Sequence, residues 1–334
     1  LGDVYKRQSE YLPHQRNVSK NTIASYRDSF VQFINYMKDI NGIPVERLLL
    51  KHLTRDNVIN YLQWLHNTKK NTSATCNYRL AAIRSFCSYL QYIVIDNMVE
   101  WQSILSIKAK KTEISPPNYL SMEGIKLLLA QPDTTSWKGR RHLALLSLMY
   151  DTGARVQEIA DLTVDCVRID TTPYTIRLTG KGRKTRIVPL AEAQVDILRS
   201  YMEENNLNDP NMMKKPLFFN GRHEKLTREG ITYILKIYAD MANKQQPEII
   251  PKKISCHSIR HSKAMHLLQA GVNLVYIRDI LGHVSIQTTD IYARADSKAK
   301  REVLENAYTR LTPNTITEKE WERNKNLFCL LYTS

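Results

Sequence analysis

The sequence predicts a mainly α-helical protein with a small β-hairpin, organised as a helical bundle followed by a mixed α+β domain. Apolar residues recur three and four positions apart along most of the chain, which is the spacing of helices that bury one face. Apolar and polar residues alternate on either side of GKGR at 180–183, a pattern typical of hairpin strands. Between the two halves, KAKKTEISPP at 108–117 is charged and then broken by two prolines, as expected of a linker. With 334 residues, of which 43% are hydrophobic, each half is long enough to form its own core.

The first domain is predicted to be a bundle of helices. An apolar stripe at 22–37 predicts its first helix, with Ser19 or Asn21 as the N-cap. Thr54 and Thr72 each precede a further apolar stripe, so we expect both to cap helices. The bundle therefore has at least three helices.

The second domain is predicted to combine helices with the hairpin. Its segment 143–150 is so apolar that this helix must be buried on most sides, and DTGA at 151–154 ends it. The other predicted elements are helices at 121–129, 156–162, 192–205, 227–243 and 297–311, strands at 174–178 and 185–190, and a short buried piece at 217–219.

The stretch from His257 to Tyr292 concentrates reactive side chains. His257 and Arg260 stand three residues apart on a predicted amphipathic helix, so both project from one face. Ser255 is a candidate N-cap, which places His257 in the first turn, where free N–H groups favour a bound anion. A second short helix follows and ends just before His283.

These four side chains suit chemistry at a phosphate. A guanidinium grips two phosphate oxygens, imidazoles exchange protons near neutral pH, and a phenol can attack phosphorus to form an ester. Each residue alone is more often a solvated or core side chain than a catalytic one. Their combination within 36 residues is what carries the prediction.

Two upstream segments add candidates. Arg155 follows the end of the apolar helix, and Glu158 lies one turn further on, where its carboxylate could hold a guanidinium or an imidazole in place. The alternative is an ordinary surface ion pair. Lys181 stands between two glycines at the predicted hairpin tip, in a ten-residue segment, 177–186, with five basic and no acidic residues. By pattern alone, such a lysine is usually part of a solvated turn.

Four motifs resemble those of the tyrosine recombinases of the phage integrase type, in the family's order and spacing. They are TGARVQEI, TGKGRKTRIVPL, HSIRH and LGHVSIQTTDIY, and the resemblance covers roughly residues 20–308. It implies an N-terminal core-binding domain that clasps DNA, a catalytic domain of the family's mixed fold, and a terminal helix that docks on a neighbouring subunit. The predicted boundaries are 9–107 for the first domain, 108–117 for the linker, 118–312 for the catalytic domain and 313–328 for a tail.

The resemblance implies site-specific DNA recombination without a metal or other cofactor. The tyrosine would attack the scissile phosphate and form a 3′-phosphotyrosyl link, which a 5′-hydroxyl of a partner duplex can reverse. The implied partner is double-stranded DNA with an inverted-repeat site, bound by a homotetramer, in integration, excision or inversion of a mobile element. The implied catalytic residues are Arg155, Lys181, His257, Arg260, His283 and Tyr292, with Glu158 in support.

The charge of the chain also favours a polyanionic partner. The formal net charge is +15, and residues 9–115 alone carry 14 basic and 8 acidic side chains, so both halves are basic. A merely soluble basic protein is the alternative on charge alone. Arg79 and Arg84, on one predicted helix, and Arg183 and Lys184, in the hairpin, are the candidate DNA contacts.

Both ends of the chain match the mosaic-end adapter of transposase-based sequencing libraries. DVYKRQ at 3–8 is encoded by one strand of that oligonucleotide, and CLLYTS at 329–334 by its reverse complement. We therefore expect residues 1–8 and 329–334 to be unnatural and the reading frame to be truncated at both ends.

Other classes of protein fit less well. The five cysteines show no CxxC pair, which favours reduced thiols in a cytoplasmic protein. The longest apolar run is too short to cross a membrane. A zinc site is conceivable but matches no standard spacing; its ligands would be Cys256, His257, His261 and His266.

Three alternative functions remain open from the sequence. A type IB topoisomerase uses similar catalytic residues but relaxes one duplex, and the helical first domain and the LGH motif favour a recombinase instead. A non-catalytic DNA-binding relative would be expected to have lost at least one of the six residues. A metal-dependent phosphatase or nuclease would need a carboxylate cluster, which the sequence does not show.

Overall fold

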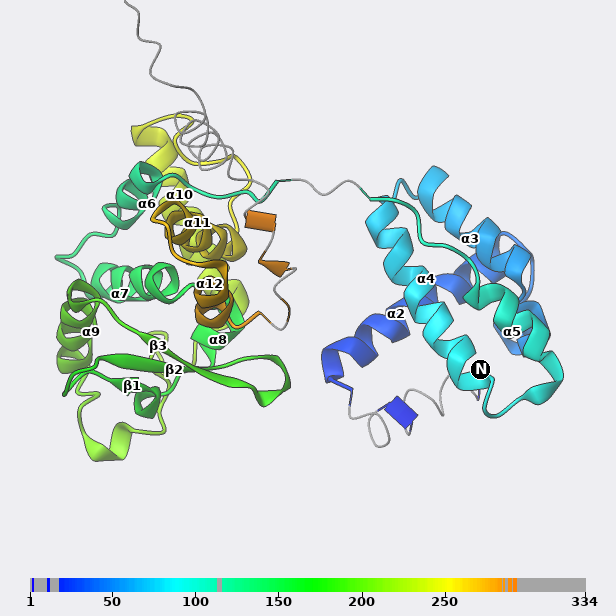
Figure 1. Cartoon of the computed structure of the whole chain (residues 1–334), viewed down its shortest axis with the longest axis horizontal. Helices are drawn as coiled ribbons and strands as arrows, with labels where there is room; N and C mark the ends of the chain where they lie inside the picture. The colour runs from blue at the N-terminus through cyan, green and yellow to red at the C-terminus, as the bar shows by residue number, and fades with distance from the viewer. Residues whose placement is uncertain are drawn as a thin grey trace, which may run out of the picture. The chain divides into compact units, whose positions relative to one another are not determined.

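The computed structural model describes residues 2, 11–12, 18–112, 116–283, 285, 288–289 and 291–292, and for Lys181 the backbone alone (Figure 1). The chain divides into two compact units, Leu1–Ile114 and Ser115–Ser334. The predicted helix at 297–311, the tail and the adapter-like segments at 3–8 and 329–334 lie outside the described residues.

The first unit is a bundle of helices, as predicted. Ser19, Thr54 and Thr72 cap its three long helices, each with its side-chain oxygen accepting from a backbone N–H of the first turn. One helix had not been predicted, the short α5, whose buried Trp101 and Ile104 pack into the bundle core. The helices are α2 (Lys20–Asp39), α3 (Arg55–Asn67), α4 (Ser73–Leu90) and α5 (Met98–Leu105).

The second unit is mixed, and a small antiparallel sheet of order β1-β2-β3 lies at one edge of its helices (Figure 1). The hairpin of β2 and β3 was predicted, and β1 adds a two-residue edge strand. The strands are β1 (Val167–Arg168), β2 (Thr175–Thr179) and β3 (Thr185–Pro189). The helices are α6 (Met122–Leu129), α7 (Trp137–Thr152), α8 (Val156–Ala160), α9 (Glu192–Glu204), α10 (Arg228–Gln245), α11 (Cys256–Gln269) and α12 (Leu274–Leu281).

Among the described helices, one predicted start was wrong by more than two residues. The helix expected at 143–150 is α7, which begins six residues earlier, at Trp137. Its first turns are polar, and their buried Arg141 donates to the carbonyl of Phe219, a partner that is distant in sequence. The helix expected at 156–162 ends at Ala160.

The packing of these helices positions the site. Helix α11 lies against both α7 and α12, α12 contacts β3, and α8 contacts β2. The end of α7, the start of α8, the hairpin and the end of α12 therefore meet on one side of α11. A membrane span is absent among the helices of the described residues, since none is long and apolar enough.

Candidate active site

Arg155 lies in the short turn that connects the end of α7 to the start of α8. Gly153 ends the helix in the left-handed conformation, with φ of 57°, and Arg155 becomes the N-cap residue of α8. Glu158 stands in the first turn of α8 and accepts from the backbone N–H of Arg155 at 2.8 Å. This local hydrogen bond holds Glu158 next to Arg155.

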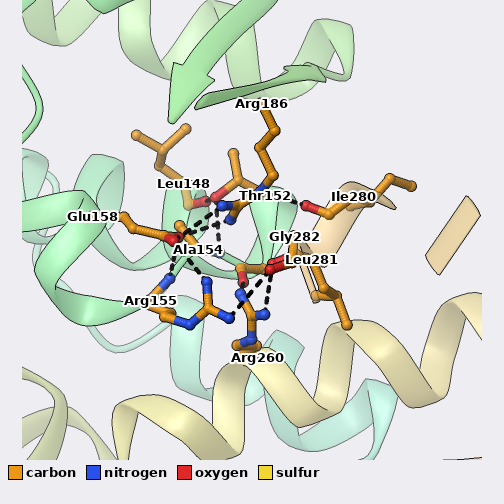
Figure 2. A network of polar contacts seen from close by, with 11 residues as sticks. Leu148, Thr152, Ala154, Arg155, Glu158, Arg186, Arg260, Ile280, Leu281 and Gly282 are labelled. Carbon is orange, nitrogen blue, oxygen red and sulfur yellow. Dashed lines mark hydrogen bonds and ion pairs between the residues drawn. The ribbon is translucent and has the colours of Figure 1, made fainter. Parts of the chain in front are cut away.

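Glu158 is the centre of a buried ion-pair cluster (Figure 2). The residue is only 4% exposed, and its carboxylate accepts from Arg155 Nη1 at 2.8 Å and from Arg186 Nη1 and Nη2 at 3.0 and 2.8 Å. Burial raises the pKa of this carboxyl, but the hydrogen bonds and charges of Arg186 and Arg155 outweigh burial and lower the pKa to about 2. Glu158 is therefore ionised, and its ion pairs with Arg155 and Arg186 are not ordinary surface ion pairs.

Three guanidinium groups also bind the end of α12. Arg186 Nε donates to the carbonyl oxygen of Ile280 at 2.7 Å, Arg260 Nη2 to that of Leu281 at 2.6 Å, and Arg155 Nη2 to that of Gly282 at 3.3 Å. These are the carbonyls that a helix leaves unpaired at its C-terminus, where cations are favoured. The cluster thus fixes the residue that follows them, His283.

Arg260 lies deep inside the second unit. Ser255 caps α11 as predicted, and Arg260, in the second turn, is 4% exposed with Nη1 donating to the carbonyl of Gly153 at 2.6 Å. Burial lowers its pKa to about 10, with help from the charge of Arg155. The guanidinium still carries its charge at neutral pH.

His257 precedes Arg260 by one turn. Burial lowers the pKa of His257, and the charges of Arg260 and Arg155 lower it further. The same two guanidiniums act on Tyr292. The structure therefore brings together five of the six predicted residues: Arg155, His257, Arg260, His283 and Tyr292.

Tyr292 is almost completely enclosed, at 1% exposure. Its hydroxyl and His261 Nδ1 are joined by a 2.8 Å hydrogen bond. The ring of His283 lies nearly parallel to the phenol, with centroids 6.3 Å apart, and His283 Nδ1 bonds to the hydroxyl of Thr289 at 2.9 Å. Burial raises the pKa of Tyr292 against the opposing charges of Arg260 and Arg155, so the phenol is protonated at neutral pH.

The imidazoles around Tyr292 are neutral at pH 7 in the free protein. Burial lowers the pKa of His261 to about 4, with contributions from His257 and Arg260. Burial likewise lowers the pKa of His283 to about 4, assisted by Arg260 and Arg155. Neutral imidazoles can accept or donate a hydrogen bond, whereas the arginines supply the fixed positive charge.

An open groove with a volume of about 540 Å³ lies beside this cluster. A phosphate entering it would meet arginine and lysine side chains and the imidazole of His283. The turn between β2 and β3 holds Lys181 and Arg183, with Lys184 directly after it, and the side chain of Lys181 lies outside the described residues. The lining residues are Arg155, Gly180, Lys184, Thr185, Arg186, Arg278, Asp279, Gly282 and His283.

The candidate DNA contacts of the first unit differ from each other. Arg79 is turned inward, since its Nη1 donates to Ser29 Oγ of α2 at 2.9 Å and its Nε is buried. Arg84 is half-buried and makes no hydrogen bond or ion pair within the described part of the chain. Arg79 thus joins α4 to α2. The sequence pattern placed Arg79 on the polar side of its helix and could not predict this contact.

The conceivable zinc site finds no support. In the described residues, no three or more His, Cys, Asp or Glu side chains are grouped so that they could hold a metal ion. His261 bonds to Tyr292, and His266 Nδ1 bonds to the hydroxyl of Tyr150 at 2.9 Å.

Comparison with known proteins decides the family. The phage integrase family model matches residues 118–299, and the model of the phage integrase N-terminal SAM-like domain matches residues 6–92. The chain belongs to the phage integrase family. A protein named as an integrase/recombinase in Sinorhizobium fredii is 32% identical over 320 residues, or 96% of this chain and 94% of the relative. The tyrosine recombinase XerD of Listeria monocytogenes is 29% identical over 312 residues, 93% of this chain and 100% of the relative.

Solved structures share the fold. The XerH site-specific recombinase bound to its difH substrate has a TM-score of 0.66 at 22% identity, covering 89% of this chain and 81% of that one. A lambda integrase has a TM-score of 0.62 at 13% identity, covering 87% and 76%. The chain is thus a tyrosine recombinase, a DNA breaking and rejoining enzyme, and the relatives support this assignment over topoisomerase-like relaxation.

Two residues of the site were missed in the sequence. Arg186 was counted among the basic residues of the hairpin, but it turns inward to Glu158. His261 was considered only as a zinc ligand, but it contacts the phenol of Tyr292. Its place one turn beyond His257 on the same helix was the pattern that could have indicated it.

Proposed function

We propose that Tyr292 is the nucleophile of this recombinase. Its oxygen attacks the scissile phosphorus, forms a 3′-phosphotyrosyl bond and releases a 5′-hydroxyl. The observation that carries the proposal is the burial of this phenol against α11, where its hydroxyl bonds at 2.8 Å to His261, the residue directly after Arg260. The charges of Arg260 and Arg155 also act on the phenol. A phosphate bound by the two guanidiniums would lie beside the phenol.

Arg155, Arg260 and His283 bind the non-bridging oxygens of that phosphate. Support comes from the bonds that fix both guanidiniums to backbone carbonyls in the free protein, because donors fixed in advance need no reorganisation when charge develops. Glu158 positions Arg155 through their 2.8 Å contact. Phosphoryl transfer then needs no metal, since the cations themselves offset the charge.

Lys181 protonates the departing 5′-oxygen, and His257 assists proton transfer. The proposal for Lys181 follows from its motif and from its place at the turn between β2 and β3. The proposal for His257 follows from its position one turn before Arg260, where the charges of Arg260 and Arg155 act on its ring.

The first unit contributes contacts along the DNA backbone. Arg84 on α4 is open to a phosphate, and the hairpin adds Arg183 and Lys184. Both backbone groups of Lys110 bond to the side chain of Asn77, at 2.8 and 2.9 Å, which fixes the basic segment 108–111 against α4. We expect Arg79 to support this surface rather than to touch DNA.

The substrate is double-stranded DNA with an inverted-repeat site, recombined by a homotetramer in the cytoplasm to move a mobile element. The XerH structure is bound to difH, and the lambda integrase is a tetramer bound to a Holliday junction. Exchange between two duplexes needs four cleavages, which four copies of one active site supply.

The test is covalent capture of DNA. Inverted repeats around a short spacer, in the DNA that flanks the gene, supply a candidate duplex, which is nicked near the crossover so that the cleaved strand cannot rejoin. Tyr292→Phe should abolish the covalent adduct on a denaturing gel and leave DNA binding unchanged in a mobility-shift assay. Tyr276→Phe is the control, because Tyr276 is an exposed phenol on α12. An adduct that persists in Tyr292→Phe would exclude this nucleophile.

A further inference from the structure

The phenol of Tyr292 has one hydrogen-bond partner within the described part of the chain, and it is His261. The bond from hydroxyl oxygen to Nδ1 is 2.8 Å, and the ring centroids are 5.6 Å apart. Tyr292 is 1% exposed, so water does not share this hydroxyl freely. Any proton that leaves the phenol oxygen therefore has His261 as its first acceptor.

Other groups near the phenol are less suited to that task. The ring of His283 is stacked within 13° of parallel to the phenol, and its Nδ1 is bonded to Thr289. The ring of His257 lies 6.2 Å from that of His261 and has no hydrogen bond with the phenol among the described residues. The carboxylate of Glu158 is taken up by two arginines. A proton acceptor must lie within hydrogen-bond reach of its proton, and His261 meets that condition.

We propose that His261 takes the phenolic proton as Tyr292 attacks the phosphate. The step rests on the proposed role of Tyr292 as nucleophile. The O–H bond of the phenol breaks and an N–H bond forms at His261 Nδ1, while the oxygen bonds to phosphorus and the bond from phosphorus to the 5′-oxygen breaks. The leaving oxygen takes a proton from Lys181, so protons and charge balance. In the reverse step, the imidazolium returns its proton to the phenol.

The charges around His261 allow this role. His257 and Arg260 of α11, His283 after α12 and the phenol itself face the imidazole. In the free protein, burial, His257 and Arg260 lower the pKa of His261 to about 4, so the ring is neutral at pH 7 and can take up a second proton. A DNA phosphate bound by Arg260 adds negative charge beside the ring, which raises the pKa of His261 toward that of an effective base.

The hydrogen bond can be tested without DNA. Nitrogen-15 NMR of the histidines reports which ring nitrogen carries the proton. We expect His261 as the Nε2–H tautomer, with Nδ1 accepting from the phenol, and a shift of this Nδ1 resonance in Tyr292→Phe. A His261 protonated at Nδ1 would donate to the phenol oxygen and could not take its proton, which would overturn the proposal.

Proton transfer is tested by the rate of adduct formation on the nicked duplex. In His261→Asn, the amide can hold the hydroxyl but cannot take its proton, so we expect a loss of about 10²- to 10⁴-fold, as large as in His261→Ala. The wild-type rate should rise with pH as the base becomes neutral. In His261→Asn, this rise of the rate with pH should be absent. A near-normal rate in His261→Asn would show that the residue only positions Tyr292.

Controls separate this proposal from folding and from the proposed function. DNA binding and thermal melting show whether each variant is folded, and His261→Gln supplies a third variant if alanine unfolds the protein. His223→Asn is the matched control, because His223 packs on Phe219 and its left-handed backbone suits asparagine. If the wild-type protein forms no adduct with DNA, the proposed function fails, whereas the NMR result on the His261–Tyr292 bond still stands.

Discussion

The arginines of the active site and the two candidate DNA-contacting arginines of the first unit are held in different ways. In the second unit, Arg155, Arg186 and Arg260 each donate to a backbone carbonyl, and two of them also bind the buried carboxylate of Glu158. In the first unit, Arg79 donates to one serine hydroxyl, and Arg84 has no partner among the described residues. The three arginines of the active site are fixed before DNA arrives, whereas the first unit includes a half-buried cation, Arg84, that has no partner among the described residues.

The difference matches two kinds of phosphate contact. A guanidinium that stabilises a transition state must be in place at the moment of reaction, and the buried bonds provide that order. A guanidinium that contacts the DNA backbone only needs to reach a phosphate, and its contribution is mainly counterion release. Changes to the two groups should therefore have separable effects on catalysis, stability and salt dependence.

Removal of Glu158 should have the largest effect. Glu158→Ala leaves Arg155 and Arg186 without their carboxylate inside the protein, and the loss of one partner of a buried ion pair costs about 3–5 kcal/mol. We expect urea unfolding to show this loss and covalent capture of DNA to fall by at least the factor of about 100 that misplaced catalytic groups cost.

Glu158→Gln is the matched variant, since it keeps the volume and one acceptor oxygen. It should fall between alanine and wild type in both measurements. Equal stability of wild type and Glu158→Ala would mean that this carboxylate does not hold the arginines of the active site. It would contradict the proposed difference between these arginines and those of the first unit.

The Glu158 cluster also shows where prediction from sequence stops. Arg155 and Glu158 could be paired in advance because they lie one turn apart on a short helix. Arg186 could not, because it comes from a strand 28 residues later and the alternation of that strand says nothing about which cation bends inward. His261 was missed for the same reason, since Tyr292 is 31 residues away.

The fold was easier to predict than the site. Helix starts with a Ser or Thr cap, such as Thr54 and Ser255, were placed correctly because the cap is a local interaction. The polar first turns of α7 were not recognised as helix, because the partner that satisfies Arg141 comes from the chain near Phe219.

A substitution at Gly180 of the hairpin should disturb the Glu158 cluster less than removal of the carboxylate does. Gly180 has an ordinary extended backbone, but a Cβ there would lie 2.9 Å from Glu158 Oε1. Gly180→Ala should therefore displace the carboxylate, at a cost of about 1–3 kcal/mol from overpacking. The pKa of Glu158, now about 2, should rise. A carboxyl with a lowered pKa stabilises the fold above its unfolded pKa, so acid unfolding should move to higher pH.

Gly182→Ala is the control for Gly180→Ala. Gly182 has φ of 74° and open space at its Cβ position, so alanine adds backbone strain without touching Glu158. Urea and acid unfolding of both variants separate the two causes. A shift of the acid midpoint in Gly182→Ala as large as in Gly180→Ala would show that strain in the turn, and not crowding of Glu158, is responsible.

The smallest effect is expected from Arg84 on α4. Arg84→Ala should leave stability unchanged, weaken DNA binding and reduce the slope of log K against log salt by about 1, because one phosphate contact is lost.

Arg79→Ala should do the opposite: it breaks the bond to Ser29 at the α2–α4 contact, which costs about 1 kcal/mol of stability, while the salt slope stays the same. Titrations of a fluorescent duplex at several salt concentrations, with urea unfolding of the same variants, measure both quantities. An equal change of salt slope in the two variants would place Arg79 on the DNA as well, and its bond to Ser29 would then be one that DNA displaces.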